Sequence, residues 1–359
     1  MLALHPQQKF DLSKYHKILC PADDYPAFLD KYIALSSMQR LKGIGLLCGT
    51  DWTKLYKNRL YYSRLDHSIG VALIVWHFTH DKAQTLAGLF HDISTSVFSH
   101  VSDFRKGDAL TQTLTEGPTA TIIRSDKELQ ALLQSDGISS SAVEDYHLYP
   151  VADNEIPQLS ADRLEYMFPS GMALDGSWTM EEIETCYKDI EVLTNEEDKP
   201  ELGFRTLEIA EEYCRHFCMI GHILQLNENK LALNMLGVIM NLAVEEGLLT
   251  EKDFMTLSEG EVIGKLEEGL KKKDKNSVRL ARLYYTFRNM TSIEHCDKAL
   301  PENDYFCVSL KVKQRYINPL VKNKNGTCKR LYELSEKGKT YIDDFKAYSD
   351  TAYGCVRLI

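Results

Sequence analysis

Residues 87–94 of the chain read AGLFHDIS, an apolar helical stretch that ends in the adjacent pair His91 and Asp92. Another stretch, HSIGVALIVWHFTH at 67–80, begins with His67. Its side chains are apolar on nearly every side, which predicts a helix in the interior of a helical bundle. Each of these two buried helices therefore carries an imidazole at one of its ends.

A third helix end carries a carboxylate. Asp162 lies in QLSADRLEY, where Ser160 or Asp162 itself can cap the helix that follows. Buried carboxylates need a compensating cation, and two imidazoles with two carboxylates form a suitable ligand set for a divalent metal that activates water. We therefore expect the three helix ends to meet, although an isolated His-Asp pair occurs by chance in many proteins that bind no metal.

The periodicity of the 359 residues predicts a mostly α protein, built as one helical bundle with a small C-terminal α+β appendage. We place the helical body at residues 1–270, with long helices over 205–226 and 228–248. Residues 271–359 form the appendage, because 304–317 alternates apolar and polar side chains as a half-buried strand does. Further helices are expected over 25–48, 82–93, 119–134 and 331–348, with loops over 103–118 and 195–203.

Composition excludes several classes of protein. A formal net charge of −10 opposes broad, sequence-blind nucleic-acid binding, which requires a cationic surface. The chain shows neither a signal-peptide pattern nor an apolar run of the roughly 20 residues that a membrane helix needs. Its nine cysteines form no CxxC pair, and we interpret them as reduced thiols. These features predict a cytoplasmic protein without membrane contact.

Several sequence blocks surround the candidate ligands. In chain order they are MQRLKGIGLLCG at 38–49, RLDHSIGVA at 64–72, AGLFHDISTSVFSH at 87–100 and SADRLEY at 160–166. Together these blocks, which span 38–170, resemble the HD superfamily of metal-dependent phosphohydrolases, and within it the branch of deoxynucleoside triphosphate triphosphohydrolases. The resemblance implies that the helical bundle is an HD domain.

The resemblance also implies a ligand set and a reaction. The four signature side chains that bind the metal in that family correspond here to His67, His91, Asp92 and Asp162. The metal would be manganese, iron, nickel or magnesium, because mixed histidine and carboxylate ligation suits several of these. Asp92 would accept or orient the proton of the attacking water, and His100 and Glu116 are the remaining candidates for proton transfer to the leaving group.

Three further side chains are candidates for substrate binding, namely Arg64, Arg163 and Tyr166. A guanidinium suits bidentate contact with phosphate oxygens, so both arginines can clamp a phosphate near the metal. Arg64 can equally pair with a structural carboxylate, and Tyr166 can equally serve in packing. The alternating cations Lys311, Lys313 and Arg315 would form either a solvated strand edge or an anion site.

The chain departs from the family pattern at several positions. Thr95 stands where the resembled triphosphohydrolases have the second histidine of H-D-x-G-H, and Thr115 falls at another family histidine. Leu46 and Ser170 replace two side chains that contact the sugar 3′-hydroxyl in those enzymes. A pocket without these polar partners would not select deoxynucleotides in the same way.

The leading hypothesis is a metal-dependent phosphohydrolase, in a homo-oligomer, that acts on a phosphate ester or anhydride of a small molecule. By resemblance, that molecule is a nucleotide. The alternative is a catalytically weak HD scaffold that binds metal or nucleotide in a regulatory or assembly role. Loss of two family histidines favours the scaffold, whereas the complete ligand set favours the enzyme.

Overall fold

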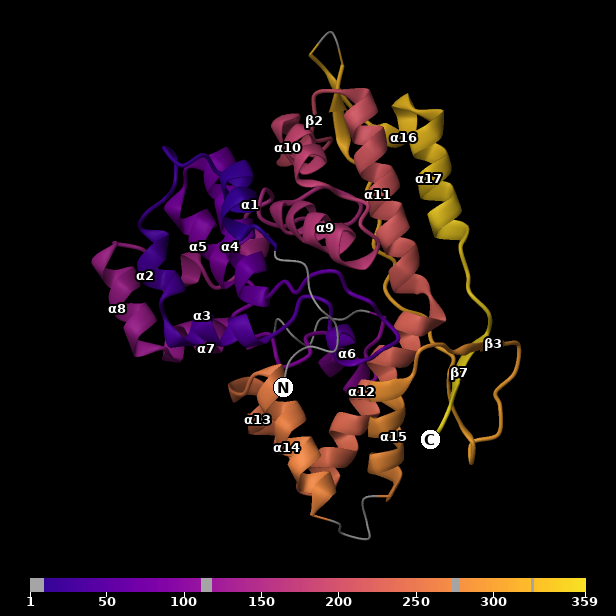
Figure 1. Cartoon of the computed structure of the whole chain (residues 1–359). Helices are drawn as coiled ribbons and strands as arrows, with labels where there is room; N and C mark the ends of the chain where they lie inside the picture. The colour runs from indigo at the N-terminus through magenta and orange to yellow at the C-terminus, as the bar shows by residue number, and fades with distance from the viewer. Residues whose placement is uncertain (1–9, 111–117, 273–277, 324–325) are drawn as a thin grey trace.

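The structure, a computed structural model, describes residues 10–110, 118–272, 278–323 and 326–359. Within these ranges it is mostly helical with two small sheets, so the predicted helical class is confirmed (Figure 1). The helices of the first half are α1 Leu12–Leu19, α2 Leu29–Ile33, α3 Ser36–Gln39, α4 Arg64–Thr79, α5 Lys82–Phe90, α6 Val101–Arg105, α7 Thr119–Ser125, α8 Lys127–Ser135, α9 Ala161–Leu174 and α10 Met180–Lys188. Short 3₁₀ helices lie between them at η1 Arg40–Gly43, η2 Thr50–Trp52, η3 Ser140–Ala142 and η4 Tyr146–Leu148.

Helix α4 is the central helix of this half and packs against α1, α5 and α9. It begins at Arg64 because Ser63 and Asp66 form a capping box, in which each side chain accepts the backbone N–H of the other. The predicted start at His67 was therefore late, and His67 lies within the first turn. The side chains from Val71 to Val75 are all buried, as their apolar character requires.

The second half contains the longest helices. Their bounds are α11 Leu207–Gln225, α12 Asn227–Glu245, α13 Glu251–Thr256, α14 Glu259–Lys271, α15 Val278–Asn289, α16 Leu331–Leu334 and α17 Glu336–Ala347. Helices α11 and α12 correspond to the predicted long helices, and α17 lies beside α11 (Figure 1). In the described part of the chain, no helix is both long enough and apolar enough to cross a membrane.

The two sheets have the strand orders β1-β2-β5-β6 and β3-β7-β4. Their strands are β1 Ile190–Thr194, β2 Pro200–Phe204, β3 Glu294–Cys296, β4 Tyr305–Val308, β5 Leu320–Lys322, β6 Cys328–Arg330 and β7 Tyr353–Arg357. Strands β1 and β2 form an antiparallel hairpin, so the loop predicted over 195–203 was wrong at its C-terminal end. Only the turn is a loop, and the side chain of Asn195 closes it by accepting the backbone N–H groups of Glu197 and Lys199.

Three predicted helices are interrupted. The stretch 25–48 contains α2, α3 and η1, because the backbone of Leu35 between α2 and α3 leaves the helical region, with ψ at 140°. The stretch 119–134 contains α7 and α8, because the Asp126 side chain accepts the backbone N–H groups of Glu128 and Leu129 and so begins a new helix. The stretch 331–348 contains α16 and α17, because Ser335 is extended and its side chain accepts the backbone N–H of Gly338. Side-chain caps therefore decided two of these three breaks.

Residues 271–359 are interwoven with the rest of the chain. Strands β5 and β6 extend the sheet that β1 and β2 begin, and β4 and β7 pack against α12. The strand predicted over 304–317 ends at Val308, where pairing with β7 ends, and the N–H of Lys313 donates to the carbonyl of Ala109 instead. The division of the chain into a helical body and a C-terminal appendage stays a prediction.

One pair of cysteines corrects the expectation that all nine are reduced thiols. Cys307 and Cys355 lie opposite each other in the register of β4 and β7, and a disulfide joins them. They are separated by 48 residues in the sequence. Only the pairing of two distant strands brings them together, so no local cysteine spacing indicated the bond.

Candidate metal centre

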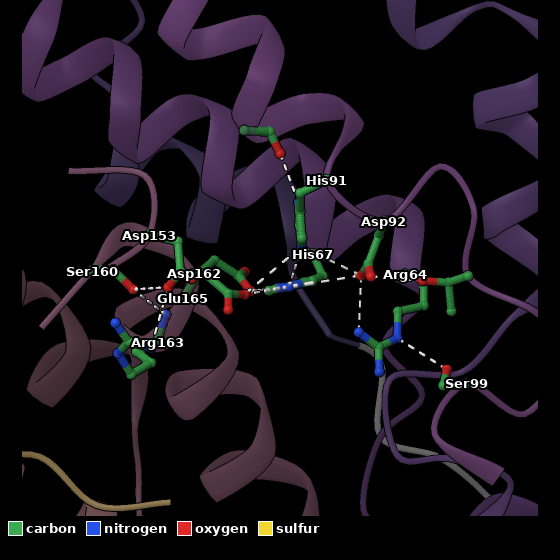
Figure 2. A network of polar contacts seen from close by, with 12 residues as sticks. Arg64, His67, His91, Asp92, Ser99, Asp153, Ser160, Asp162, Arg163 and Glu165 are labelled. Carbon is green, nitrogen blue, oxygen red and sulfur yellow. Dashed lines mark hydrogen bonds and ion pairs between the residues drawn. The ribbon is translucent and has the colours of Figure 1, made fainter. Parts of the chain in front are cut away.

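The three predicted helix ends lie together in the structure. His67 comes from the first turn of α4, and His91 directly follows the last residue of α5. Asp162 is the second residue of α9, which begins there because the Ser160 side chain accepts the N–H of Arg163. Figure 2 shows His67 between Asp162 on one side and Asp92 with Arg64 on the other.

Ligand atoms from the three helices converge. The Nε2 atoms of His67 and His91 are 3.2 Å apart, and the Oδ1 atom of Asp162 is 3.0 Å from the first and 3.7 Å from the second. These three atoms all lie within 4.8 Å of one another. Nitrogens bound to one ion at about 2.1 Å lie roughly 3 to 3.5 Å apart, so the observed spacing fits a shared divalent cation.

Asp92 is the fourth predicted ligand and adjoins the same point. Its Oδ2 atom lies 3.5 Å from the Nε2 atom of His91 and 3.9 Å from that of His67. The Arg64 guanidinium donates to the same oxygen at 2.9 Å, and the Thr95 hydroxyl donates to Oδ1 at 2.7 Å. Thr95, which replaces a family histidine, thus holds the carboxylate of Asp92 in place.

The second nitrogen of each imidazole is held from behind. The Nδ1 atom of His91 lies 2.7 Å from the carbonyl oxygen of Gly88, and that of His67 lies 2.5 Å from Glu165 Oε2. Acceptors at Nδ1 favour the tautomer that leaves the Nε2 lone pair for a cation, the arrangement found behind metal-bound histidines.

Glu165 is completely buried and anchored by two tyrosines. The hydroxyls of Tyr15 and Tyr62 donate to its Oε1 atom at 3.1 and 2.6 Å. A side chain at Gly70, on the adjacent turn of α4, would collide with the Glu165 carboxylate, 2.4 Å from the added carbon. The glycine therefore lets α4 and α9 approach closely enough for His67 to reach Glu165.

Charge also favours a cation here. Burial disfavours an ionised imidazole, but the Glu165 and Asp162 carboxylates raise the pKa of His67 to about 10. Burial alone would raise the pKa of Asp92, yet Arg64 and both imidazoles hold it well below its usual range. Burial likewise opposes ionisation of Asp162, and His67 holds its pKa low. Without a cation, the three largely buried carboxylates therefore face the Arg64 guanidinium and a protonated His67, and a divalent cation in place of that proton would remove the remaining negative charge.

A cavity of about 420 Å³ opens onto this point. Its polar lining includes the four predicted ligands, Arg64, His100, Tyr146, His147, Asp153, Arg163, Tyr166, Lys313 and Arg315. Its apolar lining includes Leu46, Leu174, Ile223, Leu233 and Val312. The cavity has the size and mixed lining of a small-molecule site.

Of the two predicted proton-transfer residues, His100 and Glu116, only His100 lies among the described residues. His100 lines the cavity, and its Nδ1 atom lies 2.9 Å from the buried carboxylate of Asp103. Burial lowers the pKa of His100, opposed by Asp103 and reinforced by Arg64 and Arg315. Glu116 and Thr115 lie outside the described residues.

The predicted substrate-binding side chains all line the cavity, but they are engaged differently. Arg64 donates to Asp92 and, through Nε, to the Ser99 hydroxyl at 3.0 Å. Arg163 pairs with Asp153 at 3.1 Å and donates to the carbonyl oxygen of Gln158 at 2.8 Å, so its guanidinium braces the cavity wall. The ring of Tyr166 packs toward Phe217, with centroids 6.1 Å apart.

Several side chains at the site were missed in the sequence. Glu165 is i+3 from Asp162 and therefore on the same face of α9, a signal that was present in SADRLEY. Lys313 and Arg315 were named in the sequence as either a solvated strand edge or an anion site, and both line the cavity. Tyr146 and His147 come from a 3₁₀ turn without apolar periodicity, and no local signal pointed to them.

Comparison with curated proteins finds partial matches. No known family profile matches the chain. A stretch of 147 residues is 29% identical to the metal-dependent phosphohydrolase cns2 of Cordyceps militaris, over 41% of each chain. The chain is similar to metal-dependent phosphohydrolases. A stretch of 144 residues is 28% identical to the uncharacterized protein YdhJ of Bacillus subtilis, over 38% of this chain and 41% of that one. The matched stretches thus span about two fifths of each curated relative.

Solved structures share the fold over nearly the whole chain. A phosphohydrolase from Bacteroides thetaiotaomicron superposes with a TM-score of 0.61 at 14% identity, covering 92% of this chain and 95% of that one. A hypothetical protein from Aquifex aeolicus superposes with a TM-score of 0.59 at 15% identity, covering 93% and 92%. At these identities the likeness concerns the fold alone.

Proposed function

We propose that the chain is a metal-dependent phosphohydrolase of the HD type that cleaves a phosphate ester or anhydride. One observation carries the proposal. The Nε2 atoms of His67 and His91 face Asp162 Oδ1 within 4.8 Å, while acceptors behind both rings fix their orientation. The similarity to a protein named metal-dependent phosphohydrolase supports the same reading.

The chain's own residues divide the work. His67, His91, Asp92 and Asp162 would hold a divalent cation of manganese, iron, nickel or magnesium, which supplies a Lewis acid and lowers the pKa of water. Asp92 is held by Arg64 and Thr95, so its carboxylate can accept or orient the proton of an attacking water. Arg64 lines the cavity beside it and can neutralise charge that develops on phosphoryl oxygens.

We further propose that the substrate is a nucleotide, as the resemblance to deoxynucleoside triphosphate triphosphohydrolases implies. The cavity supports this with a polar end at the candidate metal centre and an apolar wall that can cover a base. Leu46 and Ser170, which replace the sugar-contacting side chains of those enzymes, both line the cavity. We therefore expect weaker discrimination at the 3′-hydroxyl than in that branch. A homo-oligomeric state is also our proposal.

One observation favours the alternative of a catalytically weak scaffold. Arg163 is committed to Asp153 and to main-chain carbonyls, so one of two predicted phosphate clamps serves the wall of the cavity. Glu165 behind His67 supports metal binding, which both hypotheses allow, so turnover is the property that separates them.

Elemental analysis followed by a phosphate-release screen tests the proposal. The purified wild type and the Asp162→Ala variant would each be assayed with every candidate cation and a panel of nucleotides and phosphomonoesters. We expect bound metal and metal-dependent release of phosphate or polyphosphate, both lost in the variant. Asp24→Ala is the control, because Asp24 pairs with His80 at 2.9 Å outside the cavity. A metal-loaded wild type that turns over no phosphorylated compound would support the scaffold.

A further inference from the structure

A turn at the cavity wall brings another histidine near the candidate metal centre. Tyr146, the first residue of η4, packs against His91 with ring centroids 5.1 Å apart. The next residue, His147, packs against Tyr146 with centroids 4.4 Å apart and also lines the cavity. Two successive ring contacts thus connect His147 to a predicted ligand.

The ring of His147 is oriented by a carboxylate on each side. Asp145 Oδ1 accepts the backbone N–H of His147 at 3.0 Å and lies 2.9 Å from its Nδ1 atom. The Nε2 atom is turned toward Asp153, whose Oδ2 lies 3.4 Å away and whose side chain also lines the cavity. Asp153 is itself held by Arg163 and by the Ser160 hydroxyl, both at 3.1 Å.

This arrangement suits proton donation. Nδ1 is anchored 2.9 Å from Asp145, and Nε2 lies 3.4 Å from Asp153, which lines the cavity. A histidine that exchanges a proton with a ligand is held in the same way, through one of its two nitrogens. Asp145 and Asp153 face the imidazole, with Arg163 behind the latter. The side chain is half exposed, so solvent can exchange a proton with it.

His100 also lines the cavity, and the carboxylate of Asp103 lies 2.9 Å from its Nδ1 atom, but its other surroundings differ from those of His147. Burial lowers the pKa of His100 against the opposing effect of Asp103, and the guanidinium groups of Arg315 and Arg64 lower it further. This cation-rich side of the cavity suits phosphate oxygens.

We propose that His147 donates a proton to the leaving group of the hydrolysis proposed above, on which this inference rests, and that Asp145 positions its ring. The water oxygen forms a bond to phosphorus, and the phosphorus–oxygen bond to the leaving group breaks with its electron pair on the leaving oxygen. That oxygen takes the proton from His147 Nε2. The water releases one proton, and solvent returns one to the imidazole, so one water is consumed per bond cleaved.

The test compares His147→Gln with the wild type on the substrate of highest turnover in the phosphate-release screen, across pH. We expect kcat to fall roughly 100-fold and the decline of kcat on the alkaline side to disappear, because the acid is gone. For a 4-nitrophenyl ester of the same phosphate, the loss should shrink to less than about threefold, since that phenolate leaves without a proton. Metal content should stay at the wild-type level.

His80→Gln is the matched control. His80 is also largely exposed and lies 2.9 Å from a carboxylate, that of Asp24, but it lines no part of the cavity. It should leave kcat and its pH profile unchanged. If the wild type hydrolyses a substrate and His147→Gln has the same kcat and pH profile, the role of His147 is overturned and the proposed function stands. If the wild type hydrolyses no phosphorylated compound, the proposed function is overturned as well.

Discussion

The imidazoles of His67 and His91 are buried, and each has an acceptor fixed behind it, whereas the imidazole of His147 in the same cavity is half exposed and lies between the exposed Asp145 and the buried Asp153. The buried end is preorganised, because Arg64 holds the Asp92 carboxylate and Glu165 holds the His67 ring. The outer wall is built from turns and the C-terminal segment, which can change without disturbing the ligands. Cation binding thus depends on the buried helix ends, and substrate choice depends on the more exposed turns and C-terminal segment of the outer wall.

The largest effect should come from removing a ligand at the buried end. His67→Ala should abolish metal binding. The activation free energy should rise by several kcal/mol, which lowers metal-dependent turnover roughly a thousandfold or more, because the Lewis acid is lost. Metal analysis and phosphate release measure both. His216→Ala is the control, since that histidine is equally buried but stacks on Trp178 away from the cavity. A His67→Ala protein that keeps its metal would show that the helix ends do not form the site.

A second test concerns Glu259, a buried carboxylate whose hydrogen bonds come from the neutral donors Trp52 and Gly45. Burial raises its pKa to about 7, although Trp52 and the Gly45 N–H donate to it. Below pH 4.5, the pKa of this carboxyl in the unfolded chain, Glu259 is protonated in both the folded and the unfolded state. The folded state is therefore destabilised only as the pH rises from about 4.5 to 7, where the unfolded chain ionises and the buried carboxyl does not. The unfolding free energy of the wild type relative to Glu259→Gln should fall by roughly 3 kcal/mol over that window. Urea unfolding at several pH values measures it, and a difference independent of pH would contradict it.

The acceptor behind His67 should matter less than the ligand itself. Glu165→Gln keeps the shape of the buried side chain but weakens its hold on Nδ1, so metal affinity should fall about 10- to 100-fold. Competition with a chelator measures the affinity directly. Asp103→Asn is a matched control, because Asp103 is also fully buried and lies 2.9 Å from the Nδ1 atom of His100. Equal losses in both variants would mean that Glu165 acts on folding rather than on the ligand.

The smallest effect on activity is expected at Arg163. Its guanidinium is bound to Asp153 and to the carbonyl of Gln158, so Arg163→Lys should lower the unfolding free energy by about 1 to 3 kcal/mol. The KM of the best substrate should change by less than about threefold, since no phosphate contact is lost. Thermal melts measure the change in stability, and initial rates measure the change in KM. A KM raised tenfold or more, with unchanged stability, would restore Arg163 as a phosphate clamp.

Helices and their ends were largely predictable from sequence. The apolar run after His67, the end of α5 before His91 and the Ser160 cap ahead of Asp162 are local features, and local features are visible in a linear chain. Where the prediction failed, a single side chain had overridden periodicity. Asp126 divided one expected helix, and Asn195 closed a hairpin inside an expected loop.

The sequence by itself determined the residue types that can bind a cation and the helix ends that carry them, because caps and apolar periodicity act over a few residues. Only the tertiary structure decided which partners those residues have. Glu165 behind His67, Arg64 on Asp92 and the Cys307–Cys355 bond all join segments far apart in the chain. Packing of α4 against α9 at Gly70 and against α5 sets the first two contacts, and the pairing of β4 with β7 sets the third, and no short stretch of sequence contains that information.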